Sequence, residues 1–438
     1  MKKMLVICLT ALLILTGCGE KKDTASNEGK VLKVAGLNSG YGTEGFKKVV
    51  EAFEEAKGDG TKVELVLEKN IAEVLRPQIQ SGDVPDVIYL AIGSEGKLTD
   101  TMISEKKIMD ISDIMDMNVF GESVKLKDKI NVGVQDTMRT SPYGDGKTYL
   151  APVFYAPTGL FYNQTLFKEK GWTVPETWEE MFALGELAKA EDISLFTYPT
   201  TGYFDAFFSS ILNNMVGPEK FEKLMNYDLE TWKDPQVKET FDLVGKLLTY
   251  THPDTVAQAN GEGFTKNQQL ILDNKALFIP NGTWLAGEME KAPHAEGFKW
   301  GLTTAPVRTK GDATYATTFA EEMYIPEGAK NVDLAKEFLT FVYSDKAVEL
   351  FANNGNAIQP VKGSSDLITD EQTKDFYAIY GRGVIASSVG FAAKDPVEGV
   401  DLTSGDGILY GTVNDVVSGQ KTAEQWYQEV LDAVSKYQ

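Results

Sequence analysis

The chain of 438 residues carries 43 lysines and arginines against 64 aspartates and glutamates, which gives a formal net charge of −21. This charge argues against nucleic acid, and against an anionic lipid or substrate, as the binding partner. The length is sufficient for two ordinary domains, and the 22 Phe, 18 Tyr and 6 Trp suit a neutral ligand with apolar faces.

The N-terminal residues indicate an exported protein. Two lysines precede the apolar run Met4–Leu15, which is too short to span a bilayer. The following motif LTGC, ending at Cys18, resembles a bacterial lipobox. The resemblance implies that residues 1–17 are a signal peptide and that Cys18 receives a lipid anchor containing palmitate. Acyl chains contribute about 0.8 kcal/mol per buried methylene, so they hold a soluble domain on a membrane.

The mature chain is expected to contain no second thiol, because Cys8 lies in the segment that would be removed. This excludes disulfides, cysteine-ligated metals and a cysteine nucleophile. The two histidines, His252 and His294, lie in no metal-ligand motif, and no GxSxG or P-loop motif occurs. We therefore predict no cofactor, no metal site and no catalytic residue. Residues 18–30 are polar and predict a flexible tether.

The first folded segment predicts a βαβαβ unit with short loops, which implies a parallel sheet with right-handed crossovers. Helical spacing of Phe46, Val49 and Phe53 supports its first helix, and Thr43 is a candidate cap for that helix. The predicted elements are strand Val31–Leu37, helix Glu44–Lys57, strand Lys62–Leu67, helix Ile71–Gln80 and strand Asp86–Ala91.

Several motifs in this chain resemble those of family 1 extracellular solute-binding proteins of ABC sugar importers, the maltose-binding-protein-like group. They occur in family order and cover nearly all of the mature chain. In Pro175–Met181, Thr177 and Glu180 also form a predicted capping box. The motifs are SGDVPDVI at 81–88, GKTYLAPVFYAPTGLFYNQ at 146–164, PETWEEM at 175–181, NKALFIPNGTW at 274–284 and AKEFLTFVY at 335–343.

The resemblance implies a type II periplasmic-binding-protein-like α/β fold. In this fold two lobes, each a mainly parallel sheet flanked by helices, enclose a ligand cleft. The sequence itself predicts two extended crossings between lobes, around Pro157 and over Thr314–Ile325, and hence discontinuous lobes. We place lobe 1 at residues 31–155 and 316–362, and lobe 2 at residues 156–315 and 363–438.

Asn274–Glu288 is the strongest candidate for a binding element. Ala276–Ile279 predicts a strand that Pro280 interrupts, and Thr283 is a candidate cap for a helix starting at Trp284. Ligands of open α/β sheets bind beyond the carboxyl ends of strands. We therefore predict that Trp284 offers its face to a sugar ring; the alternative is that it packs on its own sheet.

Further candidates come from the resemblance and from the predicted crossings. Each has a structural alternative: a tight turn for the loop Asn38–Thr43, core packing for Tyr203, hinge packing for Tyr155, and solvation for one of the two glutamates. Arg382 lies in a variable region that supplies replacement contacts. The predicted substrate-binding residues are Asn38, Ser39, Tyr41, Thr43, Tyr155, Tyr203, Trp284, Glu321, Glu322 and Arg382.

The resemblance implies a carbohydrate receptor facing the outside of the cell. We expect a monomer, anchored to the cell membrane at Cys18, that captures a neutral mono- or oligosaccharide. It would deliver this sugar to ABC permease subunits and so act indirectly on their ATPase. Two alternatives remain: a lipid-anchored glycoside hydrolase, and a sensor coupled to a signalling partner. Adjacent Glu321 and Glu322 point to opposite faces of a strand, so they cannot flank one glycosidic bond.

Overall fold

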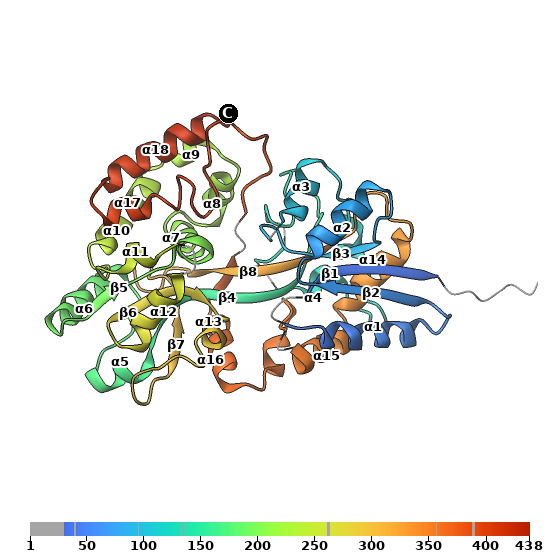
Figure 1. The fold of residues 1–438 in the computed structure, drawn as a ribbon, viewed down its shortest axis with the longest axis horizontal. Helices are drawn as coiled ribbons and strands as arrows, with labels where there is room; N and C mark the ends of the chain where they lie inside the picture. Colours follow the sequence, from blue (N-terminus) through green and yellow to red (C-terminus); the bar gives the residue numbers. More distant parts are fainter. Residues whose placement is uncertain are drawn as a thin grey trace, which may run out of the picture.

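The computed structural model describes residues 30–38, 41–94, 96–131, 133–135, 137–260, 263–355, 357–387 and 390–438. Within these residues one mixed sheet of nine strands runs through two lobes (Figure 1). Its main path has the order β2-β1-β3-β8-β4-β6-β5, while β7 pairs with β4 and β9 pairs with β8. The strands are β1 Val31–Leu37, β2 Lys62–Glu68, β3 Val87–Tyr89, β4 Ala151–Asn163, β5 Ser194–Phe196, β6 Ala276–Gly282, β7 Trp300–Thr303, β8 Tyr315–Tyr324 and β9 Ile385–Ser387.

Helices flank the sheet in both lobes. Those of lobe 1 are α1 Glu44–Lys57, α2 Ile71–Gln80, α3 Leu98–Ser104, η1 Ser112–Asp116, α4 Leu126–Lys129, α14 Val332–Val342 and α15 Asp345–Gly355. The short η4 Ser364–Leu367 contacts both α15 and the helix Glu371–Gly381. Those of lobe 2 are α5 Gln164–Lys170, α6 Trp178–Ala190, η2 Thr200–Phe204, α7 Asp205–Val216, α8 Pro218–Met225, α9 Leu229–Trp232, α10 Pro235–Leu248, α11 Thr255–Gln258, α12 Phe264–Leu272, α13 Leu285–Glu288, α16 Glu371–Gly381, α17 Val413–Val417 and α18 Ala423–Ser435.

The start of lobe 1 follows the predicted βαβαβ pattern. β1 pairs in parallel with both β2 and β3. The apolar face of α1, with Phe46, Val49 and Phe53, is buried on one side of this sheet, whereas α2 and α3 pack on the other. α1 ends at Lys57, and its C-cap Gly58 has a φ of 60°, a left-handed conformation that glycine adopts without a Cβ penalty.

The two predicted crossings are confirmed as long strands that join the lobes. β4 and β8 pair antiparallel from Ala151 opposite Met323 to Pro157 opposite Thr318. Beyond this point β4 leaves β8 and pairs with β6 and β7 of lobe 2. The lobes are therefore connected by a two-stranded ribbon (Figure 1).

Several local predictions are wrong. Thr43 lies at the N-cap of α1, but its side chain makes no capping hydrogen bond. The residue before α13 is Trp284, so Thr283 does not cap that helix. β6 continues through Pro280, contrary to the prediction. Its parallel pairing with β5 ends at Phe278, so no strand beyond this point on that edge needs a hydrogen bond from the N–H that proline lacks. The capping box of Thr177 and Glu180 is confirmed.

A cluster of three tyrosines, the hinge tyrosines, packs against the crossing strands. Tyr155 of β4 lies 5.4 Å from Tyr377 and 5.6 Å from Tyr380 between ring centroids. The Tyr377 hydroxyl donates to the Tyr155 carbonyl, and the Tyr380 hydroxyl lies 2.7 Å from Thr318 Oγ1 on β8. The two tyrosines of α16 in lobe 2 thus each form a hydrogen bond with one crossing strand, Tyr377 with β4 and Tyr380 with β8.

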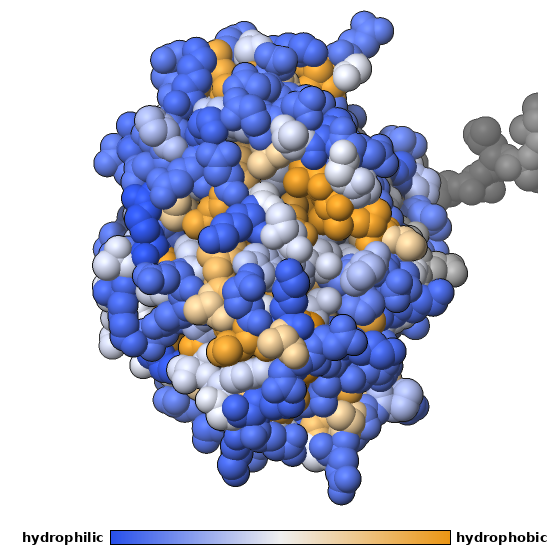
Figure 2. All heavy atoms as spheres, turned by 90° about the vertical axis from the view of Figure 1, so that its left-hand side faces the viewer, coloured by the Kyte–Doolittle hydropathy of each residue, from blue (hydrophilic) through white to orange (hydrophobic). Residues whose placement is uncertain are grey.

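A loop of lobe 1 also reaches lobe 2. Met138 packs against the lobe-2 core, and the Ala393 amide donates to the Pro142 carbonyl at 2.7 Å. The outer end of lobe 2 is covered mostly by hydrophilic residues between smaller apolar patches (Figure 2). In the described part of the chain, no helix is both long and apolar enough to cross a membrane.

Candidate functional site

Trp284 lies where β6 ends and α13 begins, as a partly exposed residue beside the interlobe ribbon. Its indole covers the backbone of Gly282: a Cβ added at that glycine would come within 2.1 Å of the ring. Any other residue at this position would displace the indole. The ring can pack in this position because Gly282, two residues before Trp284, has no side chain.

Four partly exposed aromatic rings form a row from lobe 2 to the crossing strand β8; we call it the interlobe aromatic row. Tyr203 stacks on Phe264 at 5.9 Å and lies 6.2 Å from Trp284, which meets Phe319 edge-on at 5.7 Å. Phe319 is 41% exposed, a large value for a phenylalanine on a central strand. Such apolar faces in a row are suited to stacking on sugar rings.

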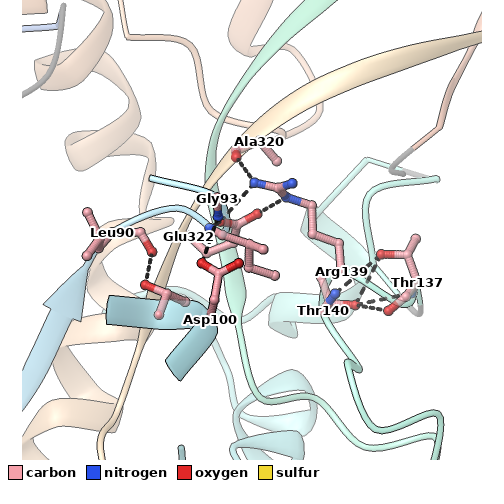
Figure 3. Close-up of polar contacts among 10 residues, drawn as sticks. Leu90, Gly93, Asp100, Thr137, Arg139, Thr140, Ala320 and Glu322 are labelled. Atoms are coloured by element: carbon pink, nitrogen blue, oxygen red, sulfur yellow. Dashed lines mark hydrogen bonds and ion pairs between the residues drawn. The ribbon is translucent and has the colours of Figure 1, made fainter. Parts of the chain in front are cut away.

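Arg139 extends this row on the lobe-1 side. Its guanidinium lies 5.7 Å from the centroid of the Phe319 ring. Its Nη2 donates to the Ala320 carbonyl at 2.8 Å, and its Nε donates to Glu322 (Figure 3). Glu322 is fully buried and also accepts from the Ile92 amide at 3.4 Å. In this conformation its carboxylate serves a buried ion pair and is not exposed to a ligand.

Glu321 has different surroundings, although it is the next residue on β8. One carboxyl oxygen, Oε2, is buried without a hydrogen-bond partner among the described residues. Burial, together with the nearby charge of Glu322, raises the pKa of Glu321 to about 8. On the lobe-1 side its neighbour is Tyr41, whose own pKa is raised by burial and by the Glu321 charge.

The other candidates that the structure describes lie at the hinge, at the end of α16 and in the β1–α1 loop. Tyr155 is 3% exposed and belongs to the hinge tyrosines. Arg382 is exposed at the C-terminal end of α16. Asn38 and Thr43 are partly exposed at the two ends of the β1–α1 loop. Ser39 and Cys18 lie outside the described residues.

Sequence reasoning missed Phe264, Phe319 and Arg139. Phe319 could have been found, because it lies two residues before Glu321 on a predicted strand and so shares its face. Arg139 and Phe264 carry no local signal, since distant elements bring them to the row. Two hollows, of about 200 and 110 Å³, lie elsewhere on lobe 1 and contain none of the predicted site residues. The described residues include no cluster of three His, Cys, Asp or Glu that could hold a metal ion.

Comparison with known sequences agrees with this architecture. The profile of the bacterial extracellular solute-binding protein family matches residues 39–349. The chain is 28% identical over 344 residues to the diacetylchitobiose binding protein NgcE of Streptomyces coelicolor, covering 76% of this chain and 70% of that protein. It is 24% identical over 368 residues to the multiple sugar-binding protein of Streptococcus mutans, covering 82% and 81% respectively.

Solved structures show the same fold at low sequence identity. The bacterial solute receptor AcbH superposes with a TM-score of 0.65 at 18% identity, covering 94% of this chain and 97% of the receptor. RafE of Streptococcus pneumoniae superposes with a TM-score of 0.66 at 16% identity, covering 92% and 97%. The two-lobed α/β fold of type II solute-binding proteins is thus confirmed, and the chain belongs to the bacterial extracellular solute-binding protein family.

Proposed function

We propose that this protein is the substrate-binding component of an ABC transporter and captures a neutral mono- or oligosaccharide between its lobes. The interlobe aromatic row carries the proposal, since it presents partly exposed rings from both lobe 2 and the crossing strand β8. A sugar stacked on these rings would contact both lobes when they close about the β4–β8 ribbon. The names of the relatives NgcE and the multiple sugar-binding protein support a carbohydrate ligand.

A thermal-shift screen over neutral mono- and oligosaccharides tests this proposal. A sugar at 100 times its dissociation constant should add about 2.7 kcal/mol to the stability of the folded protein. An anionic sugar of similar size is the matched control and should give no shift, because the protein carries a net charge of −21. A folded protein that no neutral sugar stabilises would contradict the proposal.

We further propose that the protein is not an enzyme. Glu321 and Glu322 lie on the crossing strand that carries Phe319, but Glu322 is paired with Arg139, and Glu321 lies on the opposite face of the strand, near Tyr41. They do not form the facing pair that a glycosidase needs. Incubation with chitooligosaccharides and maltooligosaccharides should release no new reducing ends. Release of reducing ends would favour the hydrolase alternative.

The location is proposed from the N-terminal motif. Cleavage before Cys18 and lipidation of its thiol would leave the binding domain, as a monomer, on a tether outside the membrane and within reach of the permease. Cys18→Ala should move the protein from the membrane fraction to the medium or periplasm. Retention of this variant in the membrane fraction would point to another anchor. Delivery of sugar, as opposed to sensing, should appear as loss of sugar uptake when the gene is deleted.

A further inference from the structure

Among the described residues, one arginine, Arg139, pairs with the adjacent carboxyl groups of β8, and it pairs with Glu322. Arg139 uses its Nε and Nη2 on Glu322 and the Ala320 carbonyl, and Glu322 is fully buried by this arrangement (Figure 3). Glu321 receives no such partner, since its Oε2 is buried and unbonded within the described part of the chain. A buried carboxylate without a counter-charge is costly, so this group keeps its proton.

The ionisable groups around Glu321 favour the neutral form. Glu322, on the same strand, opposes a second negative charge, and Tyr41 approaches from the β1–α1 loop. The residue opposite on β4 is Phe154, which has no ionisable group and lies 5.0 Å from the Tyr41 ring. The pKa of Glu321, raised to about 8, agrees with this environment. At neutral pH the carboxyl therefore carries a hydrogen that it can donate.

Glu321 also lies beside the interlobe aromatic row. Alternate residues of a strand share a face, so Glu321 lies on the same face of β8 as Phe319, about 7 Å along the strand. Trp284 meets Phe319 from lobe 2. A sugar ring stacked on the exposed face of Phe319, beside Trp284, would thus direct a substituent of the pyranose ring toward the unpaired carboxyl group.

We propose that Glu321 binds the sugar as an uncharged carboxylic acid, which donates a hydrogen bond to a carbonyl oxygen of the ligand and thereby selects acetamido sugars. The inference rests on the proposed carbohydrate-binding function and names the substrate class of the same site. An amide carbonyl is a stronger acceptor than a hydroxyl oxygen. A buried donor that finds no adequate acceptor is penalised, so a sugar lacking the acetamido group is bound more weakly.

The experiment compares N,N′-diacetylchitobiose with cellobiose by calorimetric titration at pH 6 and pH 9. These disaccharides share the β-1,4-linked backbone and differ at C2, where acetamido groups replace hydroxyls. At pH 6 we expect the acetamido sugar to bind at least about tenfold more tightly. At pH 9 its affinity should fall by about tenfold, because about nine tenths of Glu321 has then lost its proton.

Glu321→Gln is the informative variant, because its amide keeps an N–H donor at the same place and does not titrate. It should bind diacetylchitobiose at pH 6 within about threefold of the parent protein and lose the pH dependence. Glu321→Ala, which has no donor, should lose the preference for the acetamido sugar. Urea unfolding of both apo variants shows whether they remain folded.

The outcomes separate this inference from the function on which it rests. A parent affinity that does not change between pH 6 and pH 9, or equal affinities for the two disaccharides, would overturn the role of Glu321 alone. The same holds if both disaccharides fail to bind while another neutral sugar stabilises the protein. If no neutral sugar binds, the proposed function falls and the inference falls with it.

Discussion

The interlobe aromatic row and the hinge tyrosines are built from similar rings at similar distances, yet they differ in exposure and in hydrogen bonding. The hinge rings lie 5.4–5.6 Å from the central Tyr155 and are mostly buried, and the hydroxyls of Tyr377 and Tyr380 are bonded to the crossing strands. The rings of the row are 5.7–6.2 Å apart, remain partly exposed, and include a phenylalanine that is 41% exposed. Aromatic content and spacing therefore do not distinguish the two groups of rings; their exposure and hydrogen bonding do.

The largest expected effect tests the hinge. Tyr155→Ala removes a 3% exposed ring that contacts Tyr377 and Tyr380, and should lower the free energy of unfolding by about 3–5 kcal/mol. Urea unfolding of the apo protein measures this loss. Tyr155→Phe is the matched control and should cost much less, because it retains the ring. A small loss of unfolding free energy in the alanine variant would mean that packing of the hinge tyrosines does not stabilise the β4–β8 ribbon.

The next effect concerns the pH dependence of stability at the row. The pKa of Glu321 is raised from 4.5 to about 8, so the folded protein holds this proton more firmly than the unfolded chain does. The stabilising contribution is therefore full below about pH 4.5 and is lost as the pH rises toward 8. Relative to Glu321→Gln, the parent should lose on the order of 3 kcal/mol between pH 4.5 and pH 9. If the urea midpoints of the parent and of Glu321→Gln changed equally with pH, Glu321 would not be a buried neutral carboxyl group.

Trp284 tests the row directly. Trp284→Ala should weaken the binding of a cognate sugar by roughly 1.5–4 kcal/mol, because stacking and apolar burial are lost, with a smaller effect on apo stability. Calorimetric titration and urea unfolding of the same variant separate these quantities. Gly282→Ala is a sharper companion, since its Cβ would displace the indole without removing it. An unchanged affinity combined with a large loss of stability would identify Trp284 as core.

The smallest effects compare two residues of α16. Tyr380→Phe removes the hydroxyl bonded to Thr318 and should cost about 1 kcal/mol of stability. Arg382→Ala changes an exposed side chain at the end of the same helix and should cost less than about 0.5 kcal/mol. The same urea series measures both. A loss of sugar affinity in the Arg382 variant would show that this residue contributes to sugar binding.

The sequence by itself determined the elements whose signals are local. The βαβαβ start, the capping box at Thr177 and the two crossing strands follow from periodicity, capping chemistry and apolar runs, all of which act within a few residues. The family motifs extended this reasoning to the two-lobed fold. Trp284 could be singled out because strand, glycine and indole lie within one short segment.

Only the tertiary structure decided which polar and aromatic side chains are buried or paired within the fold. Glu321 and Glu322 are adjacent in sequence, but Arg139, about 180 residues earlier in the chain, pairs with Glu322, and no described residue supplies a counter-charge to Glu321. The sequence offers both Tyr155 and Tyr203 as contacts, but α16 buries the first, whereas the second remains in the partly exposed row. The strand alternation within β8 assigns each glutamate a face, but the partner on that face comes from a distant segment, and no local pattern encodes it.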